Sequence, residues 1–213
     1  MLAAVAATIT TEGLGILGTY GKFIGGYYVA LLVLWAVLLG LGAMVIGPRV
    51  RALVSMIREP LLLAFSTASS EAAYPKTLEQ LERFGVSPRI ASFVLPLGYS
   101  FNLDGSMMYC TFATLFIAQA YGIDLSGTQL ITLLLLLLVT SKGIAGVPRA
   151  SLVVLAATLP HFGIPDAGLL LVLAVDQFLD MGRSATNVVG NSIASSVVAK
   201  WEGELADPQS VAG

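Results

Sequence analysis

The residues from Tyr27 to Ile46 form an uninterrupted apolar run, YYVALLVLWAVLLGLGAMVI, that contains no charged side chain. A helix of this length spans about 30 Å, which matches the hydrocarbon thickness of a lipid bilayer. Charged residues make up only 11% of the chain, and soluble domains usually carry about a quarter. The mean hydropathy is +0.86. Because so few charges cannot cover a water-facing surface, the composition predicts an integral membrane protein.

Two shorter apolar stretches cannot cross a bilayer by themselves. The stretch at 60–65 ends in the small polar residues of 66–70, and the stretch at 130–139 ends in the small-residue segment 140–148. A further apolar stretch at 152–160 follows the second of these tips. An apolar half-helix, a tip of small residues and a returning segment together predict a re-entrant hairpin.

Each predicted hairpin is followed by a long span that contains polar residues, so the same plan occurs twice along the chain. Such a repeat is typical of secondary transporters, in which irregular backbone lines the binding site. Basic residues flank the first hairpin at Arg49, Arg51, Arg58, Lys76, Arg83 and Arg89, whereas the loops at 121–128 and 161–166 contain none. The positive-inside rule then places the first hairpin entry in the cytoplasm and the second outside, as an inverted repeat requires.

The last predicted span carries a line of polar side chains. Asp176, Asp180, Arg183, Asn187 and Asn191 are separated by three or four residues, so they share one face of a helix. Charges inside a membrane span are costly and are interpreted as functional by default. The alternative is an aspartate–arginine network that only holds helices together, but such a network needs neither the two amides nor the hairpin tips. We therefore expect a ligand site on this face.

The segment NLDGS at 102–106 interrupts the other polar span. An unwound turn exposes backbone carbonyls, and a hard cation such as sodium requires several oxygen ligands. The same five residues could form a surface turn elsewhere, but within an apolar stretch they predict a cation site. The exposed N–H groups of the hairpin tips suit a carboxylate ligand. Lys142 and Arg149, in the second tip, are expected at a solvated outer mouth.

Four motifs carry a resemblance to a known family. They are STASSEAAYP at 66–75, NLDGS at 102–106, SKGIAGVPRAS at 141–151 and DQFLDMGRSATNVVGNS at 176–192. In this order they resemble the dicarboxylate/amino acid:cation symporters, which include the bacterial and archaeal glutamate–aspartate transporters. The resemblance implies an all-α integral membrane protein with two re-entrant helical hairpins in an inverted repeat. It also implies an elevator-type mechanism, a multi-pass location in the inner membrane, and homotrimers for full-length relatives.

The resemblance also gives expected boundaries. Residues 1–12 are the end of a truncated scaffold helix, 13–201 form the transport domain, and 202–213 form a polar C-terminal tail. The transport domain is expected to contain a span at 14–47, a first hairpin at 52–87, a broken span at 88–121, a second hairpin at 127–162 and a polar span at 166–201. Whole family members are much longer than this chain, so the scaffold helices are expected to be missing.

The resemblance assigns roles to individual residues. Arg183 is expected to pair with the side-chain carboxylate of the substrate, and Asp180 with its amino group. The remaining substrate contacts are expected from Ser69, Ser70, Ser106, Val147, Ser184 and Asn187. Three cation sites are implied: one at Gly98, Asn102, Asn187 and Asn191, one at the carbonyls of Ser100, Ser141, Lys142 and Ile144, and one at Asp104 with Asn102. The geometry of a guanidinium opposite a carboxylate supports the first role on physical grounds.

Three departures from the family pattern affect these expectations. A missing helix contributes to the third cation site. Asn191 stands where sodium-coupled archaeal relatives have a carboxylate, which leaves proton coupling open. Ala68 stands where some relatives have an arginine, so the positive charge of the pocket must come mainly from Arg183.

The expected function is symport of L-aspartate or L-glutamate with sodium ions or protons, without a resident cofactor. A C4-dicarboxylate symporter is the nearest alternative, although Asp180 without an ammonium partner would repel a dianion. The other alternative is a truncated membrane module that binds ligand without transporting it. No nucleophile–base pair or transition-metal pattern indicates an enzyme, and the net charge of −2 indicates no nucleic-acid partner. The expected partners are the lipid bilayer and a small acidic substrate.

Overall fold

The computed structural model describes residues 15–141 and 148–206. Within these ranges the regular structure is helical, apart from one isolated antiparallel bridge between Val86 and Leu205. The first half contains α2 (Gly15–Ile46), η1 (Gly47–Arg49), α3 (Val50–Met56), α4 (Arg58–Thr67), α5 (Tyr74–Phe84) and α6 (Pro88–Phe101). The second half contains α7 (Asp104–Ala120), α8 (Gly127–Thr140), α9 (Ala150–Thr158), η2 (Leu159–Phe162), η3 (Asp166–Gly168), α10 (Leu169–Leu173) and α11 (Asp176–Trp201). The prediction of an all-helical protein is confirmed for the described residues.

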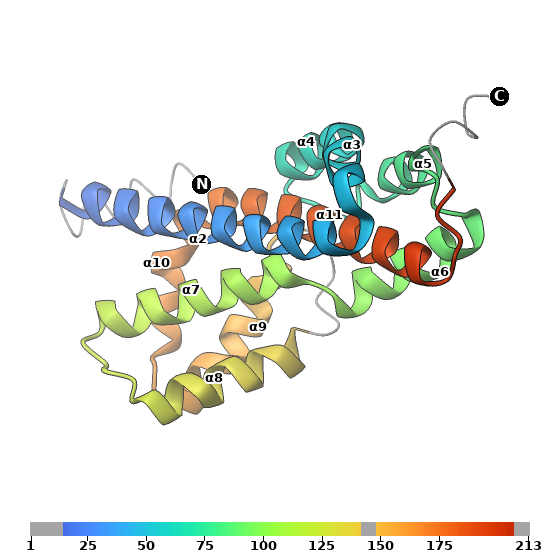
Figure 1. Cartoon of the computed structure of the whole chain (residues 1–213). Coiled ribbons are helices and arrows are strands. Elements are labelled where there is room, and N and C mark those ends of the chain that lie inside the picture. Colours follow the sequence, from blue (N-terminus) through green and yellow to red (C-terminus); the bar gives the residue numbers. More distant parts are fainter. Residues whose placement is uncertain (1–14, 142–147, 207–213) are drawn as a thin grey trace.

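Helix α11 lies at the centre of the fold. It contacts α2, α4, α6 and α7, and α2 runs alongside it for most of its length (Figure 1). Helix α7 contacts α11 on one side and the α8–α9 pair on the other. The helix that carries the predicted ligand site is therefore enclosed by segments from both halves of the chain.

The apolar core is divided into two large clusters. One joins the beginning of α2 with α7, α8, α9 and α10, and reaches α11 at Leu179. The other joins the end of α2 with α3, α5 and α6, and reaches α11 at Val189, Ile193 and Ala199. The central polar residues of α11, Asp180, Arg183 and Asn187, lie between Leu179 and Val189, so apolar packing on either side holds them in a fixed position.

Helix α2 leaves a broad apolar face uncovered. Large side chains on it remain exposed, and Met44 is 82% exposed. Such a face is unfavourable in water and is expected where lipid is the solvent. Of the described residues, the helical stretch 16–56 has the length and hydropathy of a membrane span, and α8 is a shorter apolar helix.

Two interruptions divide long helical segments. The first separates α6 from α7 at Asn102 and Leu103, within the NLDGS motif. The second, at Ala174–Val175, separates α10 from α11 within the expected polar span at 166–201. There the Val175 N–H bonds to Val172, which leaves the Leu171 carbonyl to accept a hydrogen bond of 2.8 Å from the Tyr20 hydroxyl. A contact from α2 therefore compensates for the break.

Two further tyrosines of α2 hold the first turns of α11. The Tyr28 hydroxyl donates to the Phe178 carbonyl at 2.6 Å, and the Tyr27 hydroxyl donates to the Leu179 carbonyl at 3.1 Å. One turn of the helix further along, α11 lacks a side chain at Gly182, where an added Cβ would lie 2.7 Å from Leu31. The close approach and the hydroxyl contacts fix α2 against the segment of α11 that carries the polar residues.

Candidate functional site

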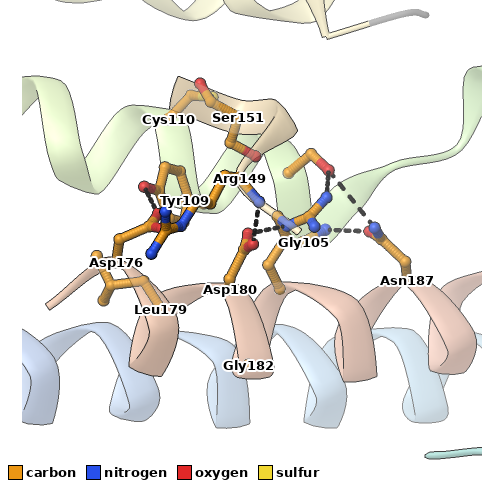
Figure 2. A network of polar contacts seen from close by, with 12 residues as sticks. Gly105, Tyr109, Cys110, Arg149, Ser151, Asp176, Leu179, Asp180, Gly182 and Asn187 are labelled. Carbon is orange, nitrogen blue, oxygen red and sulfur yellow. Dashed lines mark hydrogen bonds and ion pairs between the residues drawn. The ribbon is translucent and has the colours of Figure 1, made fainter. Parts of the chain in front are cut away.

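The polar line on α11 is buried. Asp176, Asp180, Arg183, Asn187 and Asn191 are each at most 1% exposed. In Figure 2 the side chains of Asp176, Asp180 and Asn187 point from α11 toward α7 and α9. The three- and four-residue spacing therefore places all five groups inside the helix bundle.

An ion pair forms the centre of this line. The Arg183 Nε donates to the Asp180 Oδ1 at 2.5 Å, and the Arg183 Nη1 donates to the Ser106 hydroxyl at 3.4 Å. The Asn187 amide nitrogen donates to the same hydroxyl at 3.4 Å. A guanidinium that is wholly removed from solvent requires such charged and polar partners, because an unpaired buried charge is strongly destabilising. The pair offers one cationic and one anionic group to a ligand with both kinds of charge.

The beginning of α7 is held directly against α11. The Gly105 N–H donates to the Asn187 Oδ1 at 2.9 Å (Figure 2). A Cβ added at Gly105 would overlap the backbone carbonyl of Arg183, so no larger residue fits here without moving a helix. The glycine of the NLDGS motif thus brings Ser106 within reach of Arg183.

The beginning of α9 closes the other side of the ion pair. The Arg149 backbone N–H donates to the Asp180 Oδ2 at 2.6 Å, and its guanidinium Nε lies 3.5 Å from the Asp176 Oδ2. The Arg149 side chain is also 57% exposed, so it combines the solvated position expected from the sequence with a contact to α11.

Tyr109 is a site residue that the sequence analysis did not identify. Its hydroxyl donates to the Asp176 Oδ1 at 2.5 Å, and its side chain is fully buried (Figure 2). Tyr109 follows Ser106 by three residues on α7, so it lies on the same helix face. That spacing was the available signal, once Ser106 had been assigned to the site.

The other predicted substrate contacts differ in their burial and hydrogen bonding. Ser70, in the turn after α4, and Ser184, on α11, are fully buried, and their hydroxyls have no hydrogen-bond partner among the described residues. The Ser69 hydroxyl instead accepts from the Ala72 N–H at 3.2 Å. Val147 lies outside the described residues. Ser70 and Ser184 therefore retain hydrogen-bonding capacity that a ligand could satisfy.

The first predicted cation set forms a cluster of amides. The Asn102 amide nitrogen donates to the Asn191 Oδ1 at 3.1 Å, and a Cβ at Gly98 would overlap that same oxygen. The Asn187 Oδ1 already accepts from Gly105. These oxygens are engaged by N–H donors and none is charged, so this arrangement suits a hydrogen-bonded network better than a sodium ion.

The second predicted cation set lies only partly within the described residues. The Ser141 hydroxyl donates to the Leu138 carbonyl at 3.5 Å. The exposed Ser100 hydroxyl donates to the Pro96 carbonyl at 3.3 Å. Ile144 and Lys142 lie outside the described residues, so the structure does not test this set of four carbonyls.

The third predicted cation set lies beside a cavity of about 450 Å³ between α2 and α11. Asp104, Asn102 and Gly190 line this cavity together with apolar side chains. A Cβ at Gly190 would lie 2.7 Å from the Asp104 Oδ2, so the glycine makes room for the carboxylate. Elsewhere in the described ranges, as here, no three His, Cys, Asp or Glu side chains group around one metal position.

The buried Asp180–Arg183 pair, its polar partners and the hydroxyls of Ser70 and Ser184 form a candidate site for a small polar ligand inside an apolar helical protein. The chain belongs to the sodium:dicarboxylate symporter family, whose family model matches residues 1–201. The resemblance inferred from the four motifs is therefore confirmed.

Three relatives illustrate the range within the family. The chain is 45% identical over 203 residues to the proton/sodium-glutamate symport protein of Bacillus subtilis (strain 168), and 49% identical over 202 residues to the proton/glutamate-aspartate symporter of Escherichia coli (strain K12). It is 46% identical over 203 residues to C4-dicarboxylate transport protein 2 of Polaromonas naphthalenivorans (strain CJ2). All three relatives are named as symport or transport proteins.

The aligned regions cover 95% of this chain in each case, but only 47%, 46% and 45% of the three relatives in the same order. The chain thus spans about half the length of the curated relatives it matches.

Proposed function

We propose that this chain forms the substrate-carrying part of a symporter for L-aspartate or L-glutamate. The observation that carries the proposal is the buried pair of Asp180 and Arg183, because an acidic amino acid presents an ammonium group and carboxylates together. The Arg183 guanidinium matches the side-chain carboxylate, and the Asp180 carboxylate matches the ammonium group. Ser106, Ser184 and Asn187 surround the pair and supply neutral hydrogen bonds.

The proposed coupling ions are sodium ions or protons. The names of the relatives from Bacillus subtilis and Escherichia coli support both, since one includes sodium and both include protons. The amide cluster at Asn102 and Asn191 carries no charge, which favours protons. Asp104, with its carboxylate beside the Gly190 backbone, favours retention of one cation position.

The proposed architecture is that of a transport domain at 13–201 in a multi-pass protein of the inner membrane. Its two re-entrant hairpins, at 52–87 and 127–162, would form an inverted repeat that moves by an elevator-type mechanism. The interruption at Asn102–Leu103 and the polar α11 support this proposal, because broken helices line the central sites of such transporters. Homotrimers are proposed for longer relatives that retain a scaffold.

A C4-dicarboxylate is the second candidate substrate. Both oxygens of Asp180 already accept hydrogen bonds, one from Arg183 and one from the Arg149 N–H, which reduces the repulsion that a dianion would meet. The relative from Polaromonas naphthalenivorans is named as a C4-dicarboxylate transport protein. A membrane module that binds ligand without transporting it is the third candidate.

Titration calorimetry on the detergent-purified chain separates these candidates. L-aspartate and succinate are each titrated with and without sodium at two pH values, and Arg183→Ala serves as the control. Preferential binding of L-aspartate supports the amino acid proposal, and preferential binding of succinate overturns it. Binding without uptake by reconstituted vesicles identifies the non-transporting module. Binding of neither ligand contradicts the assigned pocket.

A further inference from the structure

Arg149 has an uncommon backbone conformation for a residue with a long side chain. Its φ of 67° and ψ of 4° lie in the left-handed region, which residues other than glycine, asparagine and aspartate rarely occupy. Such a conformation costs free energy and persists only when surrounding contacts determine it. Arg149 directly precedes α9, so these contacts also determine where that helix begins.

The contacts of Arg149 are made to two acids of α11. Its backbone N–H bonds to the Asp180 Oδ2 at 2.6 Å, and its guanidinium Nε lies 3.5 Å from the Asp176 Oδ2 (Figure 2). Asp176 and Asp180 are one helical turn apart, so a single residue reaches both. The left-handed conformation presents the N–H and the side chain to α11 at the same time.

Asp176 is a buried carboxylate, and the Arg149 guanidinium is a cationic partner for it. Its side chain is 2% exposed and receives a hydrogen bond from Tyr109 on α7. The Arg183 Nε is bonded to Asp180, and the guanidinium paired with Asp176 is that of Arg149. Movement of α9 away from α11 would separate a buried carboxylate from this partly exposed partner, which has a modest cost.

We infer that Arg149 is a positioning residue that holds the beginning of α9 against α11, through its backbone to Asp180 and its guanidinium to Asp176. The frequency with which α9 separates from the Asp180–Arg183 pair is then set by this contact. The role of the Asp180–Arg183 pair as a ligand site rests on the proposed function. The contact between α9 and α11 is independent of that function.

Cys110 provides a measurement of this separation that needs no ligand. It is the single cysteine of the chain and is fully buried. Its sulfur lies 3.9 Å from the Ser151 carbonyl in the first turn of α9, so α9 covers it. The rate at which N-ethylmaleimide labels Cys110 in the folded, detergent-purified chain therefore reports opening of α9.

Two substitutions remove the cation while keeping the backbone N–H and tolerating the left-handed conformation. Arg149→Gly and Arg149→Asn are each expected to raise the labelling rate about fivefold, as loss of a partly exposed ion pair predicts. Arg149→Lys keeps the charge and is expected to label closer to the wild-type rate. Asp176→Asn removes the other partner and retains an acceptor for Tyr109, so it is expected to match Arg149→Asn.

The combined variant Arg149→Asn with Asp176→Asn distinguishes an ion pair from two unrelated effects. Its rate is expected to equal that of either single variant, since residues in contact are not additive. Arg83→Ala, which removes an exposed pair with Glu79 on α5, is the matched control and should leave the rate unchanged. Cys110→Ser defines the background.

Wild-type labelling rates in both Arg149→Gly and Arg149→Asn would overturn the inference, as would single effects that multiply in the combined variant. Addition of L-aspartate tests the proposed function separately, because a bound ligand should slow labelling of the wild-type chain. Raised rates in the variants without protection by L-aspartate or succinate support the positioning role and contradict the ligand site.

Discussion

The Arg183 Nε and the Asp180 Oδ1 lie 2.5 Å apart on one face of α11, and neither side chain is more than 1% exposed. Each group is the charged partner that permits the other to be buried. Removing either one has an effect on stability and an effect on binding, and the two effects can be separated.

Arg183→Ala is expected to abolish binding of acidic ligands and to destabilise the chain by about 3–5 kcal/mol, because Asp180 is left as a buried, uncompensated charge. Calorimetry measures the first effect and thermal unfolding in detergent measures the second. Combining Arg183→Ala with Asp180→Ala should recover most of the stability without recovering binding. Unchanged affinity for L-aspartate in Arg183→Ala would show that the assigned pocket is wrong.

Asp180→Ser is expected to shift preference from L-aspartate toward succinate. The substitution removes the carboxylate that we assign to the ammonium group, and it also removes a negative charge near a dianion. The ratio of the two dissociation constants is the quantity to measure. Asp166→Ser, at an exposed position in η3, is the control and should leave this ratio unchanged. An equal ratio in Asp180→Ser and the wild type would contradict the amino-group role.

Asn191→Asp is expected to make ligand binding more dependent on sodium. It places a charged oxygen beside Asn102 and Gly98, in a set that otherwise offers neutral oxygens, and hard cations favour carboxylate ligands. We expect sodium to improve the affinity of the variant for L-aspartate by about tenfold relative to its effect on the wild type, a change of ~1.4 kcal/mol. Choline chloride at equal ionic strength is the control. The same sodium effect in both proteins would remove Asn191 from the cation set.

Gly105→Ala is expected to destabilise the chain by about 1–3 kcal/mol, because the new Cβ overlaps the Arg183 backbone carbonyl and forces α7 away from α11. Thermal unfolding checks this value, and calorimetry should show weaker ligand binding as Ser106 moves. Gly127→Ala is the matched control, since a Cβ there meets open space at the beginning of α8. Equal unfolding midpoints for the two variants would rule out close packing at Gly105.

Glu204 lies after the end of α11, outside the expected membrane spans, and should make the free energy of unfolding depend on pH. Hydrogen bonds from Arg89 and then Ser87 lower the pKa of Glu204 below its usual 4.5. A group with a lowered folded-state pKa contributes stability above its unfolded pKa and loses it as the pH falls through the folded value. Glu204→Gln is therefore expected to flatten the fall in unfolding midpoint below about pH 4.5. An identical pH profile in the variant would show that Glu204 makes no such contribution.

The sequence predicts features that depend on local spacing. The polar face of α11 follows from the intervals between Asp180, Arg183 and Asn187, which a helix places on one side. The interruption before Asp104 follows from a polar motif in an apolar segment. Both are determined by residues close together in the chain, so pattern alone is sufficient.

Features that depend on distant contacts were not predictable in this way. The break at Ala174–Val175 contains no glycine or proline, and Tyr20, far away on α2, stabilises it. The contact between Arg149 and Asp176 depends on how α9 meets α11. Tyr109 was missed because its role arises only when α7 lies against α11. The amide contact between Asn102 and Asn191 likewise joins residues 89 positions apart.

The tyrosine hydroxyls that link α2 to the beginning of α11 also have a mechanical consequence. The Trp35 indole extends the link by donating to the Thr186 hydroxyl at 2.8 Å, so the fastening continues along α11 beyond Arg183. Rotation or sliding of α11 against α2 would break these bonds in an apolar environment, where no water can replace them. Any displacement of α11 would therefore take α2 with it as one rigid unit, and friction with the surrounding lipid would fall on the outer face of α2.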